Sequence, residues 1–139
     1  ISVTGVQTCA LPILEKLLKS EKMDFLQINY SLDDRKAADK LLPLAQEKGL
    51  AVLVNLPFGR ERLFKATDGL KLPDWAAEFD AKSWGQFYLK YIIAHPAVTA
   101  AIPGMRKEQH VVDNLGAALG KLPDADLRKR QEKFLDALG

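Results

Sequence analysis

The 139-residue sequence has a single cysteine, Cys9, and no long hydrophobic run. One cysteine cannot form an internal disulfide, and it cannot supply a zinc site by itself. The longest apolar runs, such as Leu50 to Leu56, are strand-sized and far shorter than the roughly 20 residues of a membrane helix. An excess of one charge is also missing, because 20 basic and 18 acidic side chains are interspersed and leave a net charge of +2. These absences exclude a disulfide-stapled domain and a membrane-spanning helix, and they argue against nucleic acid as the main partner.

The residues that are present suffice for a folded core. Hydrophobic residues make up 47% of the chain and charged residues 27%, which predicts one compact, soluble domain rather than a disordered or fibrous chain. The chain begins at Ile1 rather than at a methionine, and we expect this start not to be a natural N-terminus. Any targeting segment would lie upstream, so the compartment stays open, with the cytoplasm as the default expectation.

Strand-like and helix-like segments alternate along the chain. Four segments are β-branched or continuously apolar and are predicted to be strands: Ile1–Val6, Phe25–Tyr30, Leu50–Leu56 and Val98–Ile102. The segments between and after them have helical periodicity: Leu11–Leu18, Asp33–Gly49 with N-cap oxygens from Asp33 and Asp34 and a kink or restart at Pro43, a Ser83-capped helix that ends at His95, Glu108–Leu119 and Asp124–Leu138. A long excursion from Gly59 to Lys82 contains a short helix near Trp75–Phe79. Leu50–Leu56 is the clearest strand, and its continuous apolar run predicts burial on both faces.

This alternation predicts an α/β fold of parallel strands joined by right-handed crossovers. A doubly wound dinucleotide-binding sheet is an alternative, but Thr4-Gly5-Val6 offers one glycine where that fold needs a closely spaced set. A (β/α)8 TIM barrel typically has about 250 residues. Four units in 139 residues therefore correspond to the C-terminal half of such a barrel.

One strand-to-helix turn has the features of a phosphate site. In Ile102-Pro103-Gly104-Met105-Arg106, Gly104 permits close backbone approach, and the N–H groups of the following helix favour an anion. Arg106 can grip a phosphate with its planar guanidinium. The alternative interpretation is an ordinary turn in which Arg106 is a solvated charge and Asn114 is a helix-surface residue.

Several segments together resemble the aldo/keto reductase family, over Asp24 to Leu138. The segments that carry the resemblance are Leu26–Leu32 with Arg35, Gly49–Leu53 leading to Pro57-Phe58-Gly59, and Ile102–Arg106 with Asn114-Leu115. The resemblance implies that residues 1–139 form one partial barrel domain with strands five to eight. It also implies a protein that binds NADP(H) and, when intact, reduces a small carbonyl substrate by hydride transfer.

The family's pattern implies roles for the predicted site residues. Gly104, Met105 and Arg106 would hold the adenosine 2'-phosphate, Asn114 would contact the adenine, and Pro57, Phe58 and Gly59 would border the pyrophosphate. Gln27 would hydrogen-bond the nicotinamide carboxamide. At the nicotinamide the chain departs from the family, because Asn55 stands where an aromatic ring often stacks and Thr4 replaces a serine. His110, close to the Arg106 turn, either assists phosphate binding or is a solvated helix residue.

The resemblance supplies no catalytic residue. The family's catalytic Asp, Tyr, Lys and His belong to the first four strand–helix units, and Tyr30, Tyr88, Lys90 and His95 lie in no matching motif. Tyr88 and Tyr91 are predicted core residues, whereas Tyr30 follows a strand and is a candidate for lining the cofactor cleft. We therefore expect a cofactor-binding fragment that is inactive alone. The alternative is a non-catalytic NADP-binding module, or a half-barrel that assembles through its open strand edges.

Residues 5–13 fit the family pattern least well. They contain Cys9 and a Leu11-Pro12 step where an uninterrupted link from strand to helix is expected. This segment is either a non-native junction or a divergent natural loop.

Overall fold

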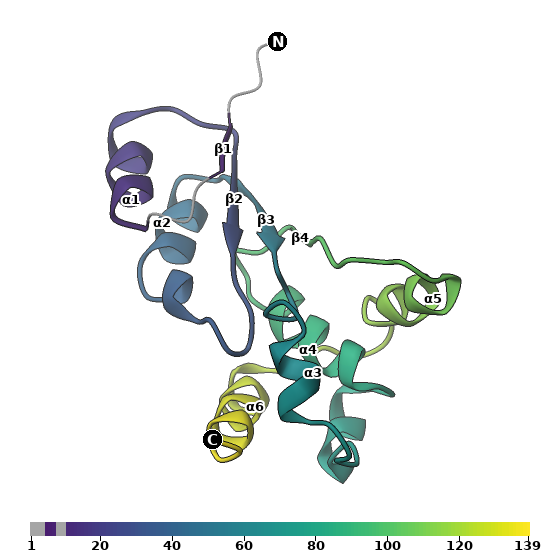
Figure 1. The fold of residues 1–139 in the computed structure, drawn as a ribbon. Helices are drawn as coiled ribbons and strands as arrows, with labels where there is room; N and C mark the ends of the chain where they lie inside the picture. Colours follow the sequence, from purple (N-terminus) through teal and green to yellow (C-terminus); the bar gives the residue numbers. More distant parts are fainter. Residues whose placement is uncertain (1–4, 8–10) are drawn as a thin grey trace.

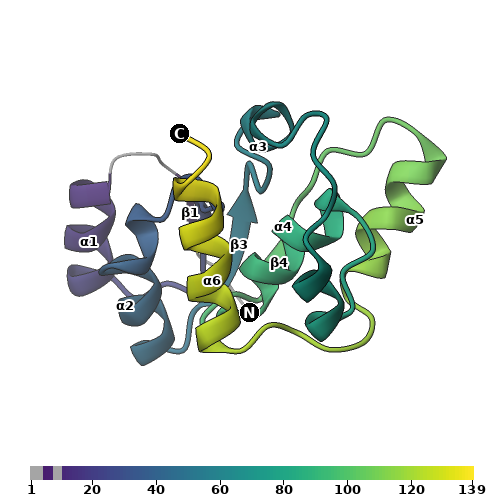
Figure 2. The same ribbon diagram turned by 90° about the horizontal axis from the view of Figure 1, so that it is seen from below.

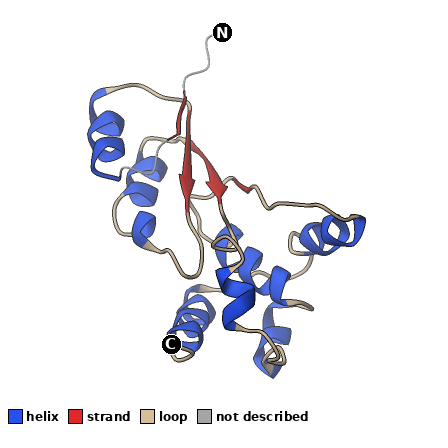
Figure 3. Cartoon of the chain, in the orientation of Figure 1, coloured by secondary structure: helices blue, strands red, loops and turns tan. Residues whose placement is uncertain are grey.

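Four parallel strands form one sheet in the order β1-β2-β3-β4. The computed structural model describes residues 5–7 and 11–139, and its strands are β1 (Gly5–Gln7), β2 (Phe25–Asn29), β3 (Ala51–Asn55) and β4 (Ala100–Ala101). Neighbouring strands run in parallel (Figures 1 and 3). In their register Leu26 lies opposite Val52 and Leu53 opposite Ala100. The prediction of parallel strands alternating with helices is confirmed.

Six α-helices connect and follow the strands in the described residues. They are α1 (Leu11–Ser20), α2 (Leu41–Glu47), α3 (Arg62–Ala66), α4 (Trp84–Ile93), α5 (Glu108–Gly116) and α6 (Ala125–Asp136). Two 3-10 helices span Lys36–Ala38 and Asp74–Phe79. Figures 1 and 2 place α1 and α5 at opposite ends of the molecule, in line with the order of the strands. None of the described helices is long and apolar enough to cross a membrane.

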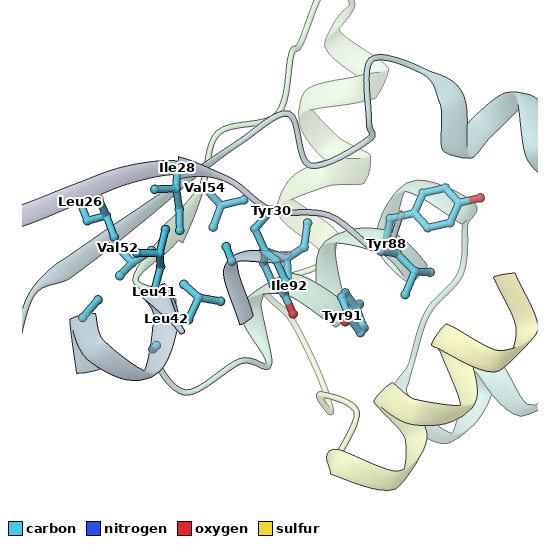
Figure 4. Close-up of a cluster of buried hydrophobic side chains, with 14 of the residues drawn as sticks. Leu26, Ile28, Tyr30, Leu41, Leu42, Val52, Val54, Tyr88, Tyr91 and Ile92 are labelled. Carbon is cyan, nitrogen blue, oxygen red and sulfur yellow. The ribbon is translucent and has the colours of Figure 1, made fainter. Parts of the chain in front are cut away.

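The two faces of the sheet differ in burial. Leu26 and Ile28 on β2 and Val52 and Val54 on β3 are fully buried, and they form the core with side chains of α2 and α4 (Figure 4). The alternate positions of β2 and β3, among them Gln27, are only half-buried. The prediction that Leu50–Leu56 is buried on both faces is therefore wrong. In a closed barrel the second face points into the interior and is packed by the opposite strands, but four strands do not close.

The helix predicted over Asp33–Gly49 is divided into a 3-10 helix and α2. Asp33 does not cap it, because its carboxylate accepts hydrogen bonds from Ser31 Oγ (2.6 Å) and Arg62 Nε (2.7 Å) instead. The α-helical part restarts at Leu41, which places Pro43 in its first turn, where a missing N–H costs little. The predicted restart at Pro43 is confirmed, and the predicted cap is not.

Among the described helices, α4 has the most buried residues. Ser83 caps it by accepting a hydrogen bond from the Gln86 N–H (3.1 Å), as predicted. Its aromatic side chains pack in the core, with Trp84 stacked on Tyr88 at 5.8 Å between ring centroids. Helix α6 is fastened to this core by Arg128, whose guanidinium donates to the Tyr30 hydroxyl (2.7 Å) and to the Tyr91 carbonyl (3.1 Å).

Two elements differ from the sequence prediction in length or presence. The fourth strand has only two paired residues, Ala100 and Ala101, rather than the five of Val98–Ile102, and in the described part of the chain it pairs with β3 alone. Helix α3 was not predicted. It has five residues and no side-chain cap, so it carries little periodic signal.

The N-terminal segment is described in part. Thr4 lies outside the described residues, so its predicted contact with the cofactor is not placed. Within residues 5–13, Gly5–Gln7 pair with Phe25–Gln27 and α1 begins at Leu11. The junction hypothesis for this segment stays a prediction.

Candidate functional site

A cleft of about 740 Å³ opens between the turn that follows β3 and the turn that follows β4. Its volume lies in the range of small-molecule and cofactor sites. One wall comes from the β3 turn and α3, and the other from the β4 turn and α5. The lining residues include Leu56, Pro57, Phe58, Arg60, Glu61 and Phe64 on the first wall and Ile102, Gly104, Arg106, His110 and Asn114 on the second.

The cleft brings together six of the predicted site residues from two segments far apart in the sequence. These are Pro57 and Phe58 on one wall and Gly104, Arg106, His110 and Asn114 on the other. Gly59 and Met105 are neighbours of lining residues without lining the cleft themselves. Parallel strands place the turns after their carboxyl ends at the same edge of the sheet, which explains why these segments meet.

The wall formed by the β4 turn and α5 has free donors. A Cβ added to Gly104 would meet no atom within 4 Å, so the backbone there is open to close approach. Lys107, which precedes α5, is in an extended conformation, and its side chain does not cap the helix. The N–H group of His110 donates to the Lys107 carbonyl (2.9 Å), whereas those of Glu108 and Gln109 have no partner among the described residues and are available to an anion. Arg106 takes part in none of the ion pairs formed by residues 11–139.

Asn114 lies on the same wall and has an unsatisfied donor. Its Nδ2 atom is buried and has no hydrogen-bond partner among the described residues. A buried polar group without a partner is costly, and in native structures it calls for an explanation such as a ligand or a water molecule. Asn114 lines the cleft, but its Nδ2 atom is covered by protein atoms, so a ligand acceptor would meet this donor only with the side chain turned toward the cleft.

Helix α5 is fastened to α4 next to the cleft. The Asp113 carboxylate accepts hydrogen bonds from Ser83 Oγ (2.8 Å) and Gln86 Nε2 (3.0 Å), which lie at the start of α4. A Cβ added to Gly85 would come within 2.9 Å of the same carboxylate. Asp113 therefore positions α5, and its charge is already engaged.

The two residues predicted to contact the nicotinamide lie together on the half-buried face of the sheet. Gln27 Nε2 donates to Asn55 Oδ1 at 2.7 Å. Because Gln27 is paired with Leu53, Asn55 lies two positions further along β3 on the same face. Neither lines the cleft, although Asn55 immediately precedes its lining residue Leu56. The structure therefore brings this pair to the cleft edge rather than into the cleft.

The three tyrosines of the sequence have structural roles. Tyr88 shares a hydrogen bond with Thr67 Oγ1 (2.6 Å), and burial raises the pKa of its hydroxyl to about 12. Burial also raises the pKa of Tyr91, whose hydroxyl donates to Glu132 Oε1 (2.6 Å). Tyr30 is fully buried and its pKa is raised by burial, so the expectation that it lines the cleft is wrong. The prediction of Tyr88 and Tyr91 as core residues is confirmed.

Lys90 and His95 are likewise used internally. Lys90 Nζ donates to the carbonyls of Leu119 (2.6 Å) and Lys121 (2.8 Å), which joins α4 to the loop before α6. His95 Nδ1 accepts a hydrogen bond from the Ala97 N–H (3.1 Å), and burial lowers the pKa of its ring. Both residues are occupied with main-chain groups away from the cleft lining.

Sequence reasoning missed the basic side chains on the first wall. Arg60 and Lys65 line the cleft, and neither takes part in the ion pairs of residues 11–139. The signal that was available for Arg60 is its place directly after Pro57-Phe58-Gly59 at the end of a strand. Among the described residues no cluster of three acidic, histidine or cysteine side chains is arranged to hold a metal.

Comparison with known proteins identifies one family. The family model described as "Aldo/keto reductase family" matches residues 1–134. No curated protein sequence matches the chain. The structure is similar to an aldo-keto reductase from Klebsiella pneumoniae in complex with NADPH, with a TM-score of 0.69 and 21% identity over 93% of this chain and 46% of that one.

Two further solved structures give the same picture. An aldo/keto reductase from Klebsiella pneumoniae in complex with NADP and acetate has a TM-score of 0.67 and 25% identity over 87% of this chain and 44% of that one. An aldo-keto reductase from Bacillus halodurans has a TM-score of 0.65 and 21% identity over 88% and 46% of the two chains. The chain spans about half the length of these structures. The fold predicted from the sequence, half of a (β/α)8 barrel, is confirmed.

Proposed function

Because the chain belongs to the aldo/keto reductase family, we propose that it is the NADP-binding part of a carbonyl reductase, with the cleft between the β3 and β4 turns as its cofactor site. The observation that carries the proposal is the cleft itself, which joins Pro57 and Phe58 to Gly104, Arg106 and Asn114. Two solved structures with this fold are complexes with NADPH or NADP.

The donors of the cleft fit the parts of NADP(H). Arg106 and the N–H groups at the start of α5 suit the adenosine 2'-phosphate, because a guanidinium and a helix N-terminus both favour phosphate. The unpaired Asn114 Nδ2 suits a ring nitrogen of the adenine. Pro57, Phe58 and Gly59 would border the pyrophosphate, with His110 close to the phosphate at the other wall.

The nicotinamide end is supported by the Gln27–Asn55 pair. Gln27 Nε2 donates to Asn55 Oδ1, and the Gln27 amide oxygen takes no part in that hydrogen bond, so it can accept one from a carboxamide N–H. Asn55 offers no aromatic ring for stacking. The nicotinamide of NADPH supplies a hydride to a carbonyl carbon when it is bound, and these residues orient the ring.

None of the described side chains fits the family's proton donor. That role needs a tyrosine whose pKa is lowered by a neighbouring lysine, whereas burial raises the pKa of Tyr30, Tyr88 and Tyr91. We therefore propose that residues 1–139 bind the cofactor and do not reduce a carbonyl substrate by themselves. The substrate is a small carbonyl compound in the whole protein.

The test is a fluorescence titration of NADPH and NADH against the parent chain and against Arg106→Ala. The parent should prefer NADPH, and Arg106→Ala should lose about tenfold or more of the affinity for NADPH with little change for NADH, because a charged hydrogen bond contributes roughly 1.5–3 kcal/mol. Arg130→Ala is the matched control, since Arg130 is exposed and pairs with Glu78 away from the cleft. Equal binding of both cofactors by the parent chain would count against the proposal.

A second candidate function is assembly through the open edges of the sheet. Within residues 5–7 and 11–139, β1 pairs only with β2 and β4 only with β3, and α5 and the loop after it expose Val112 (67%), Leu115 (63%) and Leu119 (71%). Exposed strand edges and apolar side chains favour association with another half-barrel. Size-exclusion chromatography with light scattering separates the two candidates, because a stable monomer that binds NADPH would exclude obligate edge pairing.

A further inference from the structure

The turn that forms the first wall of the cleft has an unusual backbone. Leu56, Gly59, Arg60 and Glu61 all have positive φ angles, of 50°, 57°, 55° and 71°. Residues other than glycine rarely adopt this conformation, because the Cβ atom crowds the neighbouring carbonyl. Three such residues within one turn persist only where surrounding groups hold them, and such strain is concentrated at ligand sites.

Asp33 is the group that holds this turn. It lies in the turn after β2, and its carboxylate accepts hydrogen bonds from Arg62 Nε (2.7 Å) and Ser31 Oγ (2.6 Å). The same carboxylate lies against Gly59, where an added Cβ would be 2.5 Å from Oδ2. The Asp33 side chain is only 17% exposed, whereas its partner Arg62 is 59% exposed, so the carboxylate is mostly covered and the ion pair lies at the protein surface. The two neighbouring strand-to-helix turns are thereby fixed to each other.

As a result, Arg60 in the turn and Arg62 at the start of α3 have different environments. Arg62 is bound to Asp33 and does not line the cleft, whereas Arg60 lines it. Arg106 lines the opposite wall, so the cleft carries one guanidinium on each side. Glu61 and Asp68 line the same wall as Arg60, so this wall carries residues of both charges.

We infer that Asp33 is a positioning residue, which holds the strained turn Leu56–Glu61 so that Arg60 faces the pyrophosphate of a dinucleotide whose 2'-phosphate is bound by Arg106. This inference rests on the proposed NADP-binding function and assigns a role to two residues outside the predicted set. Two guanidinium groups on opposite walls suit a ligand with two separated phosphate groups.

The first test compares two ligands on the near-isosteric variant Asp33→Asn. Adenosine 2'-monophosphate contains the 2'-phosphate but lacks both phosphates of the pyrophosphate and the nicotinamide, so its binding should not depend on Arg60. Asp33→Asn should weaken NADPH binding about tenfold while changing the affinity for adenosine 2'-monophosphate less than about twofold. Arg60→Gln should give the same selective loss. Equal weakening of both ligands, or no weakening of NADPH, would overturn the inference.

Asp34→Asn is the matched control. It removes the same charge one residue further along, and among the described contacts the Asp34 carboxylate has none, since only its main-chain atoms bond to Ser31. Both ligands should bind this variant as they bind the parent chain. A loss of NADPH affinity in Asp34→Asn equal to that in Asp33→Asn would mean that net charge rather than the position of the turn is responsible.

The second test needs no ligand, so it separates failure of this inference from failure of the proposed function. The amides of Gly59 and Arg62 donate within the turn, to Leu56 O (2.9 Å) and Gly59 O (3.2 Å). Their hydrogen exchange should be faster in Asp33→Asn and in Arg62→Gln than in the parent chain and in Asp34→Asn. Unchanged exchange in both variants would overturn the positioning role, even if the parent chain bound NADPH. Failure of the parent chain to bind either ligand would instead contradict the proposed function.

Discussion

Helices α4 and α5 lie side by side but differ in the state of their polar groups. Every residue of α4 from Gly85 to Ile92 is buried, whereas no residue of α5 is. On α4 the polar groups of Tyr88, Lys90 and Tyr91 are bonded to protein atoms. Arg106, just before α5, and Asn114 Nδ2, on α5, lack such partners among the described residues, and both residues belong to the cleft lining.

This difference separates structural from functional polar residues. A tyrosine, a lysine and a histidine on or near α4 are of the types found in catalytic centres, yet their hydrogen bonds to main-chain groups show that they stabilise the core. The less conspicuous asparagine and arginine at α5 are the ones left free for a ligand. Residue type alone therefore does not identify the functional residues. A better guide is whether each polar group already has a hydrogen-bond partner within the protein.

The largest expected effect concerns Lys90. Lys90→Met removes two hydrogen bonds from a buried ammonium to the carbonyls of Leu119 and Lys121. The free energy of unfolding should fall by about 2–3 kcal/mol, because hydrogen bonds to charged groups contribute roughly 1.5–3 kcal/mol. Urea denaturation measures this loss, and NADPH affinity under native conditions should stay within about twofold of the parent value.

Lys129→Met is the control for Lys90→Met, since Lys129 is exposed on α6. It should change stability by less than about 0.5 kcal/mol. If Lys90→Met left stability unchanged and abolished NADPH binding, Lys90 would belong to the site and the contrast between the two helices would fail.

The second-largest effect is expected at Asn114, where a substitution should lower NADPH affinity and leave stability unchanged or higher. Asn114→Ala removes a buried donor that has no partner in the unliganded protein, so stability should be unchanged or higher by up to about 1 kcal/mol. NADPH affinity should fall about three- to tenfold, the value of one neutral hydrogen bond. Paired denaturation and titration curves check both parts. A clear loss of stability with unchanged affinity would show that Asn114 is a structural residue like those of α4.

The smallest effect concerns pH and compares the two histidines. Burial lowers the pKa of His95 in the folded chain below its usual value of 6.5, so the unfolded chain binds the proton more tightly. Stability should therefore fall as the pH drops below about 6.5 and be constant above it. Unfolding curves at pH 7.5 and 5.5 should show this decrease in the parent chain and in His110→Gln. The same decrease in His95→Gln would contradict the assignment.

The fold was predictable from the sequence where the hydrophobic pattern of a strand or helix extends over many residues. Strands Phe25–Tyr30 and Leu50–Leu56, the cap at Ser83 and the helix after Asp124 agree with the structure to within a few residues. The sequence predicts less well where tertiary contacts override local preference. Asp33 was expected to cap a helix, but its carboxylate is drawn to Arg62 from a turn 29 positions away. Helix α3 is too short to give a periodic signal.

The candidate site was also predictable in part, from the sequence motifs and from the residue types in the turns after the strands. Six of the predicted residues line one cleft, which follows from the parallel order of the strands. The hydrogen bond between Gln27 and Asn55 and the burial of Tyr30 depend on register and packing, which local pattern does not contain. Arg60 was missed because its orientation depends on a backbone conformation that Arg60 and Glu61 do not favour by themselves.

The most direct test of the account maps NADP+ on the chain by backbone amide NMR shifts, with NAD+ as the comparison ligand. The account predicts that NADP+ perturbs both cleft walls, residues 56–61 and 102–114, and that NAD+ perturbs residues 104–110 much less because it lacks the 2'-phosphate. Residues 87–92 of α4, which do not line the cleft, should be nearly unaffected by either ligand. Perturbations centred on α4 or α6, or identical maps for the two ligands, would contradict the claim that the cleft beside α5 binds NADP.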